Sequence, residues 1–209
     1  MVLNVIIILL IQKKFFIMML RIKNLVSKLV KANSGQYDVL SKLLHWCMAI
    51  IIIYALIAGY AMHLVMDKPK LFHILSVLNM SWATIGAFLL VLRWIWRFFR
   101  VEPELPSSIP KLQRHIAKLA HSVIYLLMLI VFVSGFLMLK ENYSFFWLFE
   151  IPNPVKNSEV NAFFFSVHRV SCVLLLLMVV IHIIAVVKHR YINRNGVLNS
   201  MLITRHLSD

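Results

Sequence analysis

The chain has 209 residues, of which 61% are apolar and only 14% are charged, and its mean hydropathy is +0.84. Soluble domains usually contain about 45–50% apolar and about 25% charged residues. This composition therefore excludes a soluble globular protein and indicates a protein of the lipid bilayer. The formal net charge is +14. The two cysteines, Cys47 and Cys172, lie inside apolar runs and offer neither a disulfide framework nor zinc-ligand spacing.

Four apolar stretches are long enough to cross a bilayer as helices, which takes about 20 residues each. They cover residues 43–66, 71–92, 116–139 and 162–187. The chain length leaves room for one membrane bundle and little for a separate soluble domain. The predicted fold is an all-α membrane protein, a four-transmembrane-helix bundle.

The cations are distributed unevenly around these spans. Most Lys and Arg residues precede the first span, flank the connection between the second and third, or follow the fourth. The opposite side carries Lys68, Lys70, Lys140, Lys156 and Arg169. The positive-inside rule then places both termini and the middle connection in the cytoplasm. The basic balance is explained by topology and by contact with anionic membrane lipid, and it does not call for nucleic acid as a partner.

Residues 1–36 are predicted to form a basic N-terminal extension. Residues 2–11 are apolar apart from Asn4, but ten helical residues span only about 15 Å, half of a bilayer core. A signal peptide has its charges before the apolar run, and here they follow it. The extension is either an interfacial helix or the result of a start assigned upstream of the true one. Residues 37–201 are predicted to form the four-helix membrane domain, followed by a cytoplasmic tail at 202–209.

All eight Asp and Glu residues lie outside the spans, whereas several histidines lie inside them. Ionisable groups inside a membrane are costly and point to function by default. His45, His121 and His182 lie on three different spans, about 5–9 Å inside the predicted cytoplasmic boundary at 1.5 Å per residue. His168 precedes His182 by fourteen residues, so both imidazoles face nearly the same way about 21 Å apart.

The positions of these histidines are consistent with two interpretations. Neutral imidazole is a good iron ligand, and helical bundles hold haem between facing helices. Histidines in membrane helices also serve as packing and interhelical hydrogen-bonding residues, which would make this a bundle without redox function. Spacing alone leaves both open.

Short motifs in a fixed order resemble a known family. The first span opens with Leu44-His45-Trp46, the second closes at residues 92–97 (LRWIWR), and the third begins at residues 120–125 (AHSVIY). The fourth carries His168 and His182 and is followed by His189 and residues 193–196 (NRNG). Together, over residues 37–201, they resemble the bacterial cytochrome b561 family, which is related to hydrogenase-type membrane cytochrome b subunits. Ser134-Gly135 is also similar, although the proline usual before it is absent.

The resemblance implies two b haems, each held by two histidines. The cytoplasmic-side haem would be bound by His45 and His182. The outer haem would be bound by His168 and a histidine on the second span, fourteen residues before Arg93, where this chain has Asn79. An amide is a poor ligand for haem iron. A shifted ligand, a five-coordinate haem and the absence of an outer haem all remain open.

The resemblance also implies electron transfer between a donor and the quinone pool in the bacterial inner membrane. His121 and His189 would contribute to a ubiquinone site near the cytoplasmic surface. Arginines near that surface, such as Arg93 and Arg97, would pair with haem propionates. Superoxide is one candidate donor, so the chain is either an oxidoreductase of the superoxide:ubiquinone type or an electron carrier. The alternative is a membrane-anchor cytochrome b subunit with a peripheral redox subunit as its partner.

The predicted topology can be tested with reporter fusions. Reporters placed after Asp209 and near Ser107 should read as cytoplasmic, because the flanking cations are retained on that side. Reporters near Asp67 and Asn153 should read as external. An external C-terminus would show that the number of crossings is wrong.

Overall fold

The computed structural model describes residues 13–14, 16–18, 20–21, 36–100, 102–103, 109–194 and 197–202. Four long helices dominate it: α2 (Val39–Leu64), α3 (Pro69–Phe99), α4 (Lys111–Leu137) and α5 (Ser158–Val187). A π-helical turn, η1 (Lys188–Ile192), continues α5, and a 3-10 turn, η2 (Val197–Ser200), follows. All four long helices have the length and composition needed to cross a membrane. The expected N-terminal extension and tail lie mostly outside the described residues.

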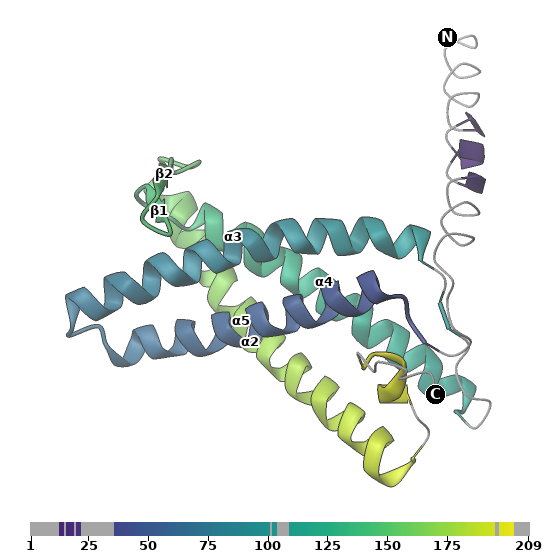
Figure 1. The fold of residues 1–209 in the computed structure, drawn as a ribbon. Coiled ribbons are helices and arrows are strands. Elements are labelled where there is room, and N and C mark those ends of the chain that lie inside the picture. The colour runs from purple at the N-terminus through teal and green to yellow at the C-terminus, as the bar shows by residue number, and fades with distance from the viewer. Residues whose placement is uncertain are drawn as a thin grey trace.

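The helices form two antiparallel pairs, α2 with α3 and α4 with α5, and the second pair crosses the first at an angle (Figure 1). Fewer contacts, between α3 and α4, join the pairs. Alternate chain directions bring the starts of α2 and α4 to the same end as the ends of α3 and α5. This end holds His45, His121 and His182 and is named the histidine end; the opposite end is the hairpin end. The four predicted spans are confirmed.

Capping groups explain why the helices extend beyond the apolar stretches. Asp38 caps α2 by accepting hydrogen bonds from Ser41 N at 2.8 Å and Ser41 Oγ at 2.6 Å. Asn157 caps α5 in the same way, and Pro69 occupies the first position of α3, where its missing N–H costs nothing. Trp96 Nε1 donates to Asp38 Oδ1 and Ser41 Oγ, so the end of α3 is tied to the start of α2.

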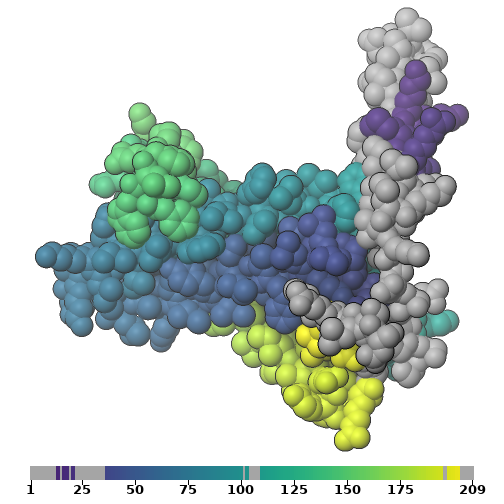
Figure 2. All heavy atoms as spheres, viewed as in Figure 1, coloured from purple at the N-terminus to yellow at the C-terminus, as the bar shows by residue number. Residues whose placement is uncertain are grey.

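A short β-hairpin follows α4 and was not predicted from the sequence. Strand β1 (Tyr143–Phe145) pairs antiparallel with β2 (Phe149–Ile151). Phe146 and Trp147 turn the chain with positive φ angles of 48° and 60°. The hairpin packs on α3, where Ser81 Oγ accepts a hydrogen bond from Phe146 N at 2.8 Å. In Figure 2 it forms a green block at one end of the bundle. The all-α expectation is correct for the spans and incomplete for this connection.

The apolar core draws residues from all four helices. Its buried members are Met48, Ile52, Leu90, Leu127, Met128, Phe132 and Leu175. Gly86 lets α3 approach its neighbours closely: a Cβ there would lie 2.8 Å from Phe132 Cζ and 3.0 Å from Ile51 Cγ2. The core thus fills the middle of the bundle, between the two levels at which histidines occur on α5.

Gly86→Ala is expected to destabilise the protein by about 1–3 kcal/mol, because the added methyl group overpacks the contact with Phe132 and Ile51. Gly59→Ala is the matched control, since no neighbouring atom lies within 4 Å of a Cβ at Gly59. The control should be neutral or stabilising by up to about 1 kcal/mol. Thermal unfolding of both variants in one detergent tests this. Equal midpoints would contradict the close packing at Gly86.

Candidate functional site

The histidine end brings together side chains from all four helices. His45 comes from α2, Arg93 from α3, His121 from α4 and His182 from α5. The ring centres of His45 and His182 are 6.5 Å apart, and those of His121 and His182 are 5.3 Å apart. The expectation that these three histidines share one depth is confirmed. His182 is the common neighbour of the other two.

The separation of His45 and His182 suits a shared metal ion. Imidazole nitrogens lie about 2 Å from a bound metal ion, so two imidazoles on opposite sides of one ion have ring centres about 6 Å apart. The 6.5 Å separation fits this arrangement better than the 5.3 Å between His121 and His182. Helices α2 and α5 do not pack closely on each other within the described chain, so the two imidazoles meet between separated helices. His45 and His182 therefore fit an iron centre.

Arg93 fixes the orientation of His45. Its guanidinium donates from Nε to Tyr125 Oη at 2.7 Å, and a second nitrogen lies 2.9 Å from His45 Nδ1. Because a guanidinium only donates, Nδ1 accepts this bond, and the neutral ring of His45 carries its proton on Nε2. Coordination of iron through His45 Nε2 therefore requires Arg93 to release Nδ1.

The histidine end is rich in cations and poor in anions. Arg93 and Arg97 lie over the Tyr125 ring, at 5.5 and 5.8 Å from its centre. Among the described residues, one ion pair is found, between Arg100 and Glu102 at 3.3 Å. Burial raises the pKa of Tyr37, with the Arg100 guanidinium opposing the shift, so this phenol stays neutral beside Arg100. A ligand with carboxylate groups would meet Arg93 and Arg97 without competition from a described acid.

His189 lies in η1, just beyond α5, where Asn193 Nδ2 approaches its Nδ1 at 3.3 Å. Short π-helical turns within helices are frequent at functional sites. The flanking Lys188 and Arg190 are exposed, as expected for the basic rim of a membrane protein.

His168, nearer the hairpin end, has different surroundings. Its Nδ1 lies 3.0 Å from Val131 O and 3.2 Å from Ser134 Oγ. Because a carbonyl only accepts, Nδ1 carries the proton and donates a hydrogen bond to Val131 O of α4. The other ring nitrogen, Nε2, lies 3.5 Å from the Cys172 thiol of the same helix. Gly135 leaves room for the ring, since a Cβ there would lie 3.2 Å from His168 Cε1.

Asn79 occupies the α3 position at which the sequence resemblance implies a second ligand. It lies seven residues before Gly86, so both residues are on the same face of α3, toward the bundle interior. Its Oδ1 is buried and has no hydrogen-bond partner. The other histidines of α2 and α3, His63 and His73, are exposed near the helix ends. The described residues therefore do not pair His168 with a second imidazole, and this position does not fit a haem held by two histidines.

Two features of the site were not predicted from the sequence. One is the role of Tyr125, although its position four residues after His121 puts both on one face of α4. The other is the link of Trp96 to Asp38 and Ser41, for which the sequence gives no local sign.

A four-helix membrane bundle that gathers three imidazoles and an arginine at one end has the arrangement of a b-type membrane cytochrome. The sequence profile of the prokaryotic cytochrome b561 family matches residues 36–203, so the chain belongs to this family. The chain is also similar to cytochrome b561 homolog 2 of Escherichia coli (strain K12), with 27% identity over 172 residues, covering 80% of this chain and 91% of that protein. Family membership implies a haem b electron-transfer protein of the cytoplasmic membrane.

Proposed function

We propose that this protein holds haem b between His45 and His182 at the histidine end and passes single electrons to ubiquinone there. The observation that carries the proposal is that the imidazoles of His45 and His182, which come from two helices with few direct contacts, have ring centres 6.5 Å apart. The family supplies the identity of the group, haem b. When bound, haem supplies a reversible one-electron change at its iron.

We assign Arg93 different hydrogen-bond partners before and after haem binds. Without haem it donates to His45 Nδ1 and Tyr125 Oη. Charge-assisted bonds to a carboxylate are about twice as strong as neutral ones, so the haem carboxylates would draw Arg93 away from His45. His45 Nδ1 would then be free to carry the ring proton in place of Nε2, and Nε2 would be left unprotonated for iron. Tyr125 remains beside Arg93 and Arg97 and limits how far either guanidinium moves.

His121 is assigned to the quinone. Its side chain is exposed on α4, and its ring lies 5.3 Å from that of His182. It therefore connects the lipid-facing surface, from which a quinone approaches, to a proposed iron ligand. A ring N–H can donate a hydrogen bond to a quinone carbonyl oxygen and deliver a proton as the quinone is reduced. His189, Lys188 and Arg190 lie at the same end and extend the polar surface of this site.

Replacement of either proposed ligand tests the assignment. His45→Ala and His182→Ala should each lower the haem content per chain by at least about tenfold, because even changes beside a metal ligand weaken binding by about 10–100-fold. The double variant should be little worse than either single one, since both remove ligands of the same iron. Haem absorbance relative to protein, measured on the purified variants, gives the result.

Two variants serve as controls. His63→Ala changes an exposed histidine of α2 far from the site and should retain its haem. His121→Ala should also retain haem, but its reduced form should be reoxidised more slowly by a water-soluble ubiquinone. Full haem content and an unchanged spectrum in His45→Ala would contradict the assignment. Loss of haem in His121→Ala would instead make His121 the partner of His182.

A further inference from the structure

We propose that this chain binds a single haem b, at the histidine end, because Asn79 removes the second imidazole of the other site. The inference rests on the proposed function, since it takes the His45–His182 site as the one that is kept. It makes the hairpin-end half of the bundle a structural element without iron.

The ring nitrogens of His168 are both engaged within the protein. Its Nδ1 donates to Val131 O at 3.0 Å, and its Nε2 faces the Cys172 thiol at 3.5 Å. A histidine that binds a metal often donates its other N–H to a backbone carbonyl, so the Nδ1 bond alone would suit a ligand. The second requirement is another imidazole nearby. His45 meets it for His182, because their ring centres are 6.5 Å apart at the histidine end, but no described imidazole meets it for His168.

Asn79 marks the place of the missing ligand. It shares the interior face of α3 with Gly86, and its buried Oδ1 has no partner. An unsatisfied buried polar atom costs about 1–3 kcal/mol, so its presence calls for a reason. The family resemblance gives that reason: it implies an imidazole ligand at this position of α3, and the amide that stands there has no described partner.

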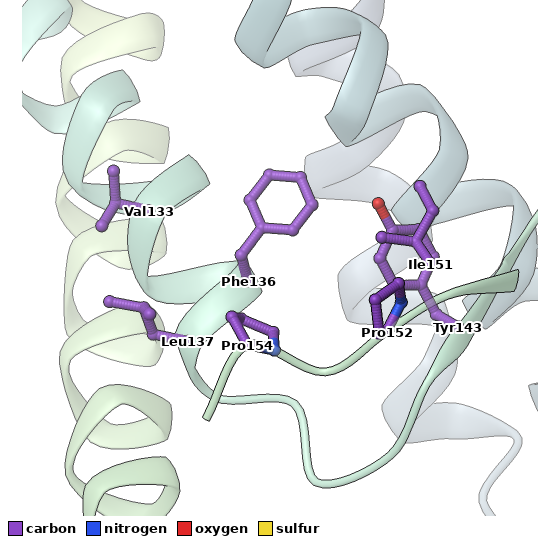
Figure 3. Close-up of a pocket in the computed structure, with 7 residues that line it drawn as sticks. All are labelled: Val133, Phe136, Leu137, Tyr143, Ile151, Pro152 and Pro154. Atoms are coloured by element: carbon purple, nitrogen blue, oxygen red, sulfur yellow. The ribbon is translucent and has the colours of Figure 1, made fainter. Parts of the chain in front are cut away.

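Other side chains hold the hairpin end together. Tyr143 from β1 forms a 2.9 Å hydrogen bond with Thr84 of α3, and its ring lies 6.1 Å from that of Phe136 of α4. A cavity of about 390 Å³ lies between the end of α4 and the chain that follows β2. Figure 3 shows that Phe136, Tyr143, Pro152 and Pro154 line it. Its lining contains no histidine, cysteine or methionine, so the cavity offers no imidazole or sulfur ligand for iron.

One consequence concerns electron donors. His168 and His182 are separated by about 21 Å along α5, and the rate of electron tunnelling falls exponentially with distance. Without iron near His168, a reductant such as superoxide at the hairpin-end surface would have no nearby acceptor. A reductant that approaches the histidine end is therefore required.

The test is the haem-to-chain ratio of the purified full-length protein, with haem measured as its pyridine complex and chain by amino-acid analysis. The wild-type ratio should be one, and His168→Ala should leave it at one. Asn79→His should raise the ratio to two, because it restores an imidazole on the interior face of α3. Asn79→Gln, which adds no imidazole, and the double variant Asn79→His/His168→Ala should both stay at one.

Each of the other possible outcomes would overturn one specific claim. A wild-type ratio of two would overturn the single-haem proposal. A ratio of one in an Asn79→His variant with wild-type thermal stability would overturn the role given to Asn79. A ratio near zero in the wild type would instead contradict the proposed function itself.

Discussion

The arrangement of the histidine end depends on the guanidinium group of Arg93, which must find partners inside the protein. Its guanidinium lies within a membrane-spanning helix, and its described protein partners, Tyr125 and His45, are neutral. Charges inside a membrane are costly and are normally paired with one another or with backbone carbonyls. A phenol oxygen, an imidazole nitrogen and an aromatic face satisfy its donors without neutralising its charge. An anion from outside the chain would supply the neutralising charge that these partners lack.

This constraint explains several other features of the bundle. The α2–α3 and α4–α5 pairs are each closely packed, and fewer contacts join one pair to the other. At the histidine end a large planar group with carboxylates, held by His45 and His182, would bridge the pairs. Asp38, a buried acid at the start of α2, already accepts hydrogen bonds from Ser41 and Trp96. It therefore caps α2 and anchors α3 rather than pairing with Arg93. The apolar core at Phe132 and Leu175 isolates the site from the hairpin end.

The sequence predicts the four spans well, because bilayer thickness imposes a long apolar run on each helix. It also predicts that His45, His121 and His182 share a level, since depth follows from the residue count along helices of known rise. Depth does not decide which two imidazoles face each other. That depends on the rotation of each helix about its axis, which contacts such as Gly86 with Phe132 and Ile51 determine.

The β-hairpin and the Arg93–Tyr125 contact could not be predicted for a related reason. The hairpin turns at Phe146 and Trp147, which adopt positive φ angles that bulky residues rarely accept, and its contacts with Ser81 and Thr84 span about sixty residues of sequence. By contrast, the departure at Asn79 is evident from the sequence, and the structure adds that its Oδ1 is buried and unpartnered.

The most direct test of the central claim is the low-temperature electron paramagnetic resonance spectrum of the oxidised, purified protein. If one iron is held by His45 and His182, the wild type should show one low-spin ferric haem signal per chain. That signal should be missing from both His45→Ala and His182→Ala and present in His168→Ala. A high-spin signal in the wild type, or a low-spin signal that persists in His45→Ala, would contradict the pairing of these two histidines on one iron.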